Sequence, residues 1–129
     1  MILDSTFLID VLRGETAVGE LITELDTSGT PFVSSITVME LVEGIHLATA
    51  TDHERRAVKE LLAEVHELHF DRECAFQAGR INAELVSAGK PTDETDVMIA
   101  ATGLVHDQPV VTRNVDHFER IDDLRVVSY

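Results

Sequence analysis

Short apolar runs alternate with longer segments of helical periodicity along almost the whole 129-residue chain. The segments between most of these runs carry apolar residues at three- and four-residue spacing, which is typical of amphipathic helices. Strands that are separated by helices form parallel sheets, because each helix carries the chain back across the sheet. The pattern therefore predicts an α/β fold with helices on both faces of a central parallel sheet. We expect strands at residues 1–4, 32–34, 65–70, 109–112 and 125–128.

The helices expected between these strands have recognisable start and stop signals. Thr51 opens a capping-box pattern, and Asp71 stands at the start of a long helical segment, so both are expected as N-caps. Residues 1–129 are expected to form a single domain, because this length is sufficient for one hydrophobic core. We expect helices over residues 6–12, 15–28, 37–50, 52–64, 72–87 and 97–105, and a helical turn around His117 and Phe118.

The chain is strongly acidic, with 24 Asp and Glu residues against 10 Lys and Arg residues and a net charge of −14. This balance argues against non-specific binding to nucleic acid at low salt. Two explanations remain open: the acids bind metal ions, or the surface is adapted to a very salty cytoplasm. Most of the acids fall on expected helix faces, so surface adaptation accounts for the bulk of them and only a few need be functional.

Several classes of protein are excluded by composition. No apolar run approaches the roughly 20 residues that span a bilayer, and the first residues lack the basic and small-residue features of a signal peptide. We therefore expect a cytoplasmic protein without membrane association. The single cysteine, Cys74, excludes an internal disulfide and is expected to be a small buried side chain on a helix. We assign no metal-binding role to the histidines.

Four acidic side chains are expected at one edge of the sheet, because each follows a strand or begins a helix there. The carboxyl ends of parallel strands share one edge, and sites in open α/β sheets form at that edge. Converging carboxylates repel one another unless a cation neutralises them, and oxygen ligands favour Mg²⁺ or Mn²⁺ over zinc. Such a site suits hydrolysis of a phosphodiester. The four residues are Asp4, Glu40, Asp96 and Asp116.

Each acid also has a structural explanation. Asp4 can cap the helix expected over 6–12, and Glu40 can complete a T-x-x-E capping box with Thr37. Three further acids fall in first helical turns or loops, where a carboxylate is favourable: Asp93, Asp96 and Asp116. Of these, Asp93 is interpreted mainly as a cap.

Four stretches of the chain, together with the closing LRVV at 124–127, span its whole length. They are LDSTFLID at 3–10, SITVMELVEG at 35–44, DVMIAA at 96–101 and VVTRNVDHF at 110–118. In these stretches the chain resembles the PIN-domain ribonucleases, specifically the VapC-type toxins of type II toxin–antitoxin systems. The resemblance implies a PIN-like three-layer α/β/α sandwich around a central parallel sheet of four to five strands. It also implies a Mg²⁺- or Mn²⁺-dependent endoribonuclease that leaves a 5′ phosphate and a 3′ hydroxyl.

The resemblance assigns catalytic roles to the acids. The family's best-fixed acids map onto Asp4, Glu40 and Asp96, which would hold one or two divalent ions directly or through water. The fourth acid is less regular; Asn114 stands where many relatives have aspartate, so Asp116 is favoured. Auxiliary or substrate-binding roles fall to Ser5, Thr6, Thr112, Arg113 and Asn114. For Arg113, contact with substrate phosphate and a simple exposed loop position both stay open.

The same resemblance implies three partners: an RNA substrate, a second copy of the chain in a homodimer, and a cognate antitoxin whose basic residue occupies the acidic site. Two other hypotheses stay open. A catalytically weak PIN-like binding or scaffold protein would explain Asn114 and the high negative charge. Another Mg²⁺-dependent phosphohydrolase, such as a phosphatase, usually begins with D-x-D, whereas Asp4 is followed by Ser5 and Thr6.

Overall fold

A computed structural model describes residues 1–15, 19 and 30–129 of the chain. In this part of the chain, five short strands form one parallel sheet with the order β3-β2-β1-β4-β5. The expected strands are thereby confirmed, and the helix expected over 15–28 lies largely outside the described residues. The strands are β1 Ile2–Leu3, β2 Phe32–Ser34, β3 His66–Leu68, β4 Val110–Val111 and β5 Val126–Val127.

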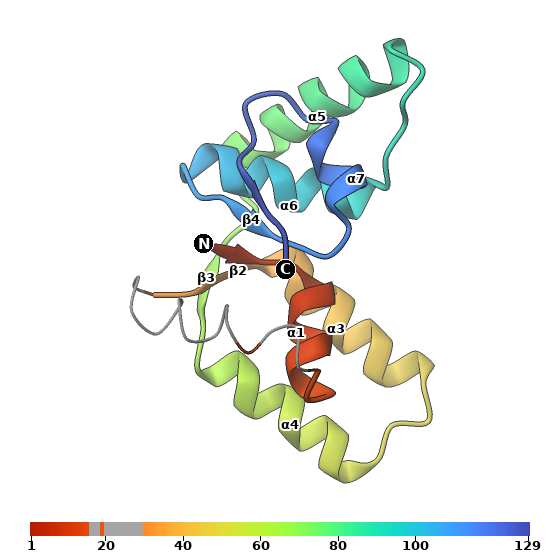
Figure 1. The fold of residues 1–129 in the computed structure, drawn as a ribbon, viewed down its shortest axis with the longest axis vertical. Helices are drawn as coiled ribbons and strands as arrows, with labels where there is room; N and C mark the ends of the chain where they lie inside the picture. The colour runs from red at the N-terminus through yellow and green to blue at the C-terminus, as the bar shows by residue number, and fades with distance from the viewer. Residues whose placement is uncertain (16–18, 20–29) are drawn as a thin grey trace.

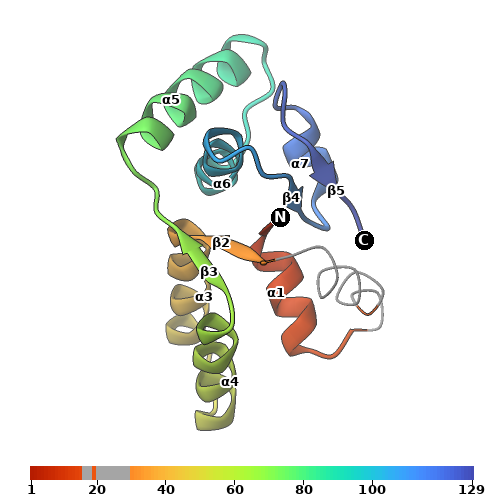
Figure 2. The same cartoon turned by 90° about the vertical axis from the view of Figure 1, so that its left-hand side faces the viewer.

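Helices cover both faces of the sheet, as Figures 1 and 2 show. Three of them lie on one side and three on the other, so the predicted α/β/α sandwich is confirmed for the described residues. On the first side are α1 Ser5–Leu12, α3 Ser35–Leu47 and α4 Asp52–Ala63. On the second side are α5 Arg72–Ser87, α6 Glu94–Val105 and α7 Val115–Glu119.

The hydrophobic core is divided in two by the sheet. Successive residues of a strand point to opposite faces, so Ile2 packs with α5, α6 and α7, whereas Leu3 packs with α1, α3 and α4. In β4, Val110 belongs to the same half of the core as Ile2, and Val111 belongs to the same half as Leu3. β1 and β4 are therefore buried on both faces, which explains why their sequences are continuously apolar.

The small residues of α6 allow this helix to lie close to neighbouring backbone. Ala100 and Ala101 are fully buried, and a Cβ atom on Gly103 would lie 2.9 Å from the main-chain oxygen of Gln108. This close approach places the last turn of α6 directly against the segment that leads into β4.

Two of the predicted helix caps are confirmed. The hydroxyl of Thr51 accepts a hydrogen bond from the main-chain nitrogen of Glu54 at 3.1 Å, and Asp71 accepts one from that of Cys74 at 3.0 Å. Cys74 itself is buried on α5, as expected.

The capping box predicted for Thr37 and Glu40 is wrong. Helix α3 begins directly after β2, and Ser34 is its N-cap, with a side-chain oxygen 3.1 Å from the main-chain nitrogen of Ile36. Thr37 and Glu40 therefore lie inside the helix, where no main-chain donor needs the Glu40 carboxylate. This removes the main structural explanation for Glu40.

The longest described helix, α5, has 16 residues, which is shorter than the roughly 20 that span a bilayer. Within the described ranges, no helix combines the length and the apolar character that a membrane-spanning segment requires.

Candidate active site

Asp4 closes β1 and is the N-cap of α1, so the cap predicted for it is confirmed. The residue is only 1% exposed. Its Oδ1 accepts a 2.8 Å hydrogen bond from the main-chain nitrogen of Ser5. Its Oδ2 accepts hydrogen bonds from the hydroxyls of Thr112, at 2.8 Å, and Thr6, at 3.1 Å. One carboxylate thus serves as helix cap and is at the same time oriented by two hydroxyl groups.

The expected auxiliary residues lie around Asp4 because β1 and β4 are neighbours in the sheet. Leu3 pairs with Val111, which places Asp4 beside Thr112. The Thr112 hydroxyl also accepts a hydrogen bond from the main-chain nitrogen of Asn114 at 3.0 Å. The Asn114 side chain itself is exposed and makes no capping hydrogen bond to α7.

Glu40 lies in the second turn of α3 and near two other carboxylates. Burial is the largest cause of a raised pKa at Glu40, and together with the negative charges of Asp4 and Asp96 it raises that pKa to about 7, although hydrogen bonds with Ser5 and Thr95 act in the opposite direction. Its Oε1 atom is buried and has no hydrogen-bond partner among the described residues. A buried carboxylate oxygen without a donor is unfavourable when ionised, so this atom fits a position that a cation would complete.

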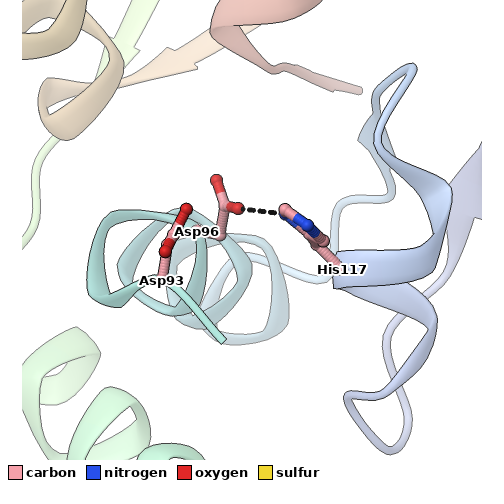
Figure 3. Close-up of side chains that lie close together, drawn as sticks. All are labelled: Asp93, Asp96 and His117. Atoms are coloured by element: carbon pink, nitrogen blue, oxygen red, sulfur yellow. Dashed lines mark hydrogen bonds and ion pairs between the residues drawn. The ribbon is translucent and has the colours of Figure 1, made fainter. Parts of the chain in front are cut away.

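Asp96 lies in the first turn of α6, and Figure 3 shows it between Asp93 of the same helix and His117 of α7. Its Oδ2 is 3.0 Å from Nδ1 of His117. Burial raises the pKa of Asp96, the contact with His117 lowers it, and the charge of Asp4 raises it again. One ligand atom from each of Asp93, Asp96 and His117 lies within 4.8 Å of the others, so this group can hold a metal ion.

His117 is the site residue that the sequence analysis missed, since we assigned no metal role to any histidine. Asp116, the predicted fourth acid, is exposed in the first turn of α7 and is not part of this group. Successive helical residues point about 100° apart, so Asp116 and His117 do not face Asp96 together. Asp93 occupies the predicted N-cap position of α6 but makes no side-chain cap hydrogen bond. The role of Asp116 stays a prediction.

Arg113 contacts Thr6 through its main chain and Asp10 of α1 through its side chain. Its main-chain nitrogen donates to the Thr6 hydroxyl at 3.3 Å, and its Nη1 lies 3.3 Å from Oδ1 of Asp10. We did not identify Asp10 from the sequence. A signal was present, because Asp10 lies three residues after the buried Phe7 and so on the apolar face of α1.

The donor set around Asp4 fits a divalent cation. Asp4, Glu40 and Asp96 are close enough for their charges to interact, and one Glu40 oxygen is unpaired within the described structure. Carboxylate oxygens suit Mg²⁺ and Mn²⁺, and an added imidazole nitrogen suits Mn²⁺ better than Mg²⁺.

Comparison with known proteins identifies related sequences and structures over most of the chain. The family model described as the PIN domain matches residues 1–124. Ribonuclease VapC19 of Mycobacterium tuberculosis is 32% identical over 124 residues, which cover 96% of this chain and 96% of that protein. The tRNA(fMet)-specific endonuclease VapC of Salmonella typhimurium is 35% identical over 97 residues, which cover 75% of this chain and 74% of that protein. A chain in the crystal structure of DNA-bound VapBC from Salmonella typhimurium has a TM-score of 0.88 and 31% identity, with coverage of 98% of this chain and 96% of that chain. The chain therefore belongs to the PIN-domain family.

Proposed function

We propose that this PIN-domain protein is a metal-dependent endoribonuclease and the toxin of a toxin–antitoxin pair, acting in the cytoplasm. The observation that supports this proposal best is that Asp4, Glu40 and Asp96 lie close together at one edge of the sheet. One buried Glu40 oxygen there has no hydrogen-bond partner in the described structure. The relatives named ribonuclease and endonuclease VapC support RNA as the substrate. The proposed reaction hydrolyses the phosphodiester and leaves a 5′ phosphate and a 3′ hydroxyl.

In this proposal Asp4, Glu40 and Asp96 would hold Mg²⁺ or Mn²⁺. The fourth ligand would be either Asp116, through a water molecule, or His117, directly. When bound, the ion neutralises the carboxylates, contacts phosphate oxygens and lowers the pKa of water. The protein itself prepares the ligands. The hydroxyls of Thr6 and Thr112 fix Oδ2 of Asp4, and the His117 contact lowers the pKa of Asp96.

The substitution Asp4→Asn tests the proposal. Asparagine keeps a side-chain oxygen that can cap α1, so the fold is expected to remain while one charge of the site is removed. RNA cleavage in Mg²⁺ or Mn²⁺ is expected to fall on the order of 10²-fold or more, and growth inhibition is expected to disappear. Asp52→Asn, an exposed first-turn acid of α4, is the matched control. Cleavage by Asp4→Asn at the parent rate would refute the assignment.

An antitoxin is the partner that we propose for a groove between α1, α3 and α4. The groove has a volume of about 600 Å³, is lined largely by apolar side chains such as Leu12 and Ile45, and reaches Glu40. A polypeptide segment with an apolar face and a basic side chain would cover the lining and bring its charge to Glu40. The similarity to solved VapBC complexes supports a partner of this kind.

We also propose a homodimer, which exposed apolar side chains on α3 support. Met39 and Val42 are one helical turn apart and both exposed. A second copy of this chain would cover them. Sedimentation of the parent as a dimer and of Val42→Glu as a monomer is the expected result, and a monomeric parent would contradict the proposal.

A further inference from the structure

Asp10 is an acid on the buried side of α1 with a contact at each carboxylate oxygen. The residue is 2% exposed. Its Oδ1 is 3.3 Å from Nη1 of Arg113, and its Oδ2 accepts a 2.7 Å hydrogen bond from the hydroxyl of Tyr129. Three segments that are distant in the sequence therefore meet at one carboxylate beside the acidic site.

Stability alone is a weak explanation for this arrangement. Burial of the Asp10 carboxylate costs desolvation energy, and its attraction to the half-exposed Arg113 is weakened by solvent, so the pair adds little stability. The partner hydroxyl is itself held in place, because the Tyr129 ring packs edge-on against Phe7 with centroids 5.2 Å apart and an interplanar angle of 84°. Burial and the Asp10 contact raise the pKa of Tyr129, so the hydroxyl remains a donor at neutral pH.

The result of these contacts is a guanidinium with a defined position. The Arg113 main chain is anchored to Thr6, whose hydroxyl binds Asp4. Its side chain leads to Asp10, which lies six residues beyond Asp4 along the helix, a distance of about 9 Å. The Arg113 side chain is 56% exposed, and among the described residues its hydrogen bond and ion pair to Asp10 are made through Nη1. The remaining N–H groups of Arg113 are available to an anionic ligand, although the chain as a whole carries a net charge of −14.

We propose that Asp10 and Tyr129 are positioning residues that hold the Arg113 guanidinium beside the acidic site, where it binds an RNA phosphate next to the cleaved one. This inference rests on the proposed ribonuclease function. Fixing the side chain before RNA arrives reduces the conformational entropy that binding must offset. The contact is to a non-reacting phosphate, so it acts equally on bound substrate and transition state, and its loss raises KM rather than lowering kcat.

The test measures KM and kcat of the full-length protein on a single-stranded RNA at several salt concentrations. Arg113→Ala is expected to raise KM about tenfold, to change kcat less than about twofold, and to reduce the slope of log KM against log salt by about 0.7. Asp10→Asn and Tyr129→Phe are expected to change KM and the slope in the same direction, KM by a few-fold. The double variant Asp10→Asn/Arg113→Ala is expected to match Arg113→Ala, because Asp10 acts through Arg113.

The control is Asp107→Asn, which breaks another Arg–Asp pair. Asp107 Oδ1 lies 3.1 Å from Nη2 of Arg125. Asp107 precedes β4 and Arg125 precedes β5. Loss of this ion pair is expected to leave KM unchanged. Tyr129→Phe keeps the ring that packs on Phe7 and so provides a folded test even if Asp10→Asn does not fold.

The positioning role is overturned if Tyr129→Phe and any folded Asp10→Asn keep the parent KM and salt slope, or if the double variant is additive. Absence of Asp4-dependent cleavage in the parent instead overturns the proposed function, and the positioning role with it.

Discussion

The hydroxyl of Thr112 donates a 2.8 Å hydrogen bond to Oδ2 of Asp4, although 108 residues separate the two in the chain. Parallel pairing of β1 with β4 produces this contact, because both residues directly follow paired strand positions. Thr112 is fully buried, and its hydroxyl also accepts a hydrogen bond from the main-chain nitrogen of Asn114. A single hydroxyl therefore joins the first acid of the site to the loop that leads into α7.

The first prediction concerns this hydroxyl. Thr112→Val keeps the side-chain shape but leaves Asp4 Oδ2 with one donor fewer and the Asn114 nitrogen without its acceptor. We expect a loss of about 1–3 kcal/mol in the free energy of unfolding and a fall in RNA cleavage of about tenfold or more. Thr112→Ser keeps the hydroxyl and should cleave within a few-fold of the parent. Urea unfolding and single-turnover cleavage measure the two effects; equal rates for the valine and serine variants would contradict the orienting role.

A second prediction follows from the raised pKa of Glu40, from 4.5 to about 7 in the folded protein. Between these values the folded state binds more protons than the unfolded state, so the stability of the metal-free protein falls as pH rises from about 4.5 to about 7. Metal affinity changes in the opposite sense, because the ionised carboxylate is the ligand and protons compete below pH 7.

Glu40→Gln should remove both effects of that residue. We expect the Tm of Glu40→Gln in chelator to gain on the parent between pH 5 and pH 8. In calorimetry, the parent should bind Mn²⁺ more tightly at pH 8 than at pH 6, with a smaller change in the variant. A Tm difference that is independent of pH would show that the Glu40 pKa is not raised.

A third prediction distinguishes Asp116 from His117. Because His117 lies 3.0 Å from Asp96 and Asp116 is exposed, His117→Ala should weaken Mn²⁺ binding about tenfold or more. Asp116→Ala should change it less than His117→Ala does. Calorimetric titration with Mn²⁺ gives both affinities without any RNA present. The reverse order would identify Asp116 as the more important residue, as the sequence resemblance favours.

The groove between α1, α3 and α4 supplies a fourth prediction. Leu12 lines the groove and is partly exposed, so Leu12→Asp should weaken binding of the cognate antitoxin about tenfold or more. RNA cleavage by the variant should remain at the parent level, since Leu12 is the last residue of α1 and Asp4 lies at the opposite end of that helix. Leu47→Asp places the same charge on exposed α3 surface outside the groove and should bind normally. Equal affinity of both variants would place the antitoxin elsewhere.

Much of the fold and part of the site could be predicted from the sequence. Two-residue strands such as β1 and β4 are buried on both faces, and this makes their sequences apolar enough to identify. Asp4 and Asp96 could be placed together because strand ends and helix starts of a parallel sheet share an edge. Glu40 could be placed at the same edge, although the capping box predicted for it was wrong. β2 passes directly into α3, so Ser34 is the N-cap one turn before Thr37.

His117 and Asp10 could not be placed in the same way, because their partners are set by tertiary packing. A helix of five residues, such as α7, is too short for its periodicity to show which face packs inward. Asp10 resembles an ordinary polar residue of α1, and its two partners lie 103 and 119 residues away. Local patterns identify elements and their edges, whereas these contacts depend on how α7 and the last strand are packed.

The order of the sheet also determines when the site can form during synthesis. β1 is the central strand, with β2 on one side and β4 on the other. It leaves the ribosome before the other four described strands, and it obtains its second neighbour only when residues 110–111 have followed. Pairing over such long sequence separation is slow, because the chain must close a large loop first. Thr112, which donates a hydrogen bond to Asp4, directly follows β4 and is therefore synthesised at the same late stage. A translation product that stops before β4 therefore has its first three acids in the chain but no complete framework to hold them together.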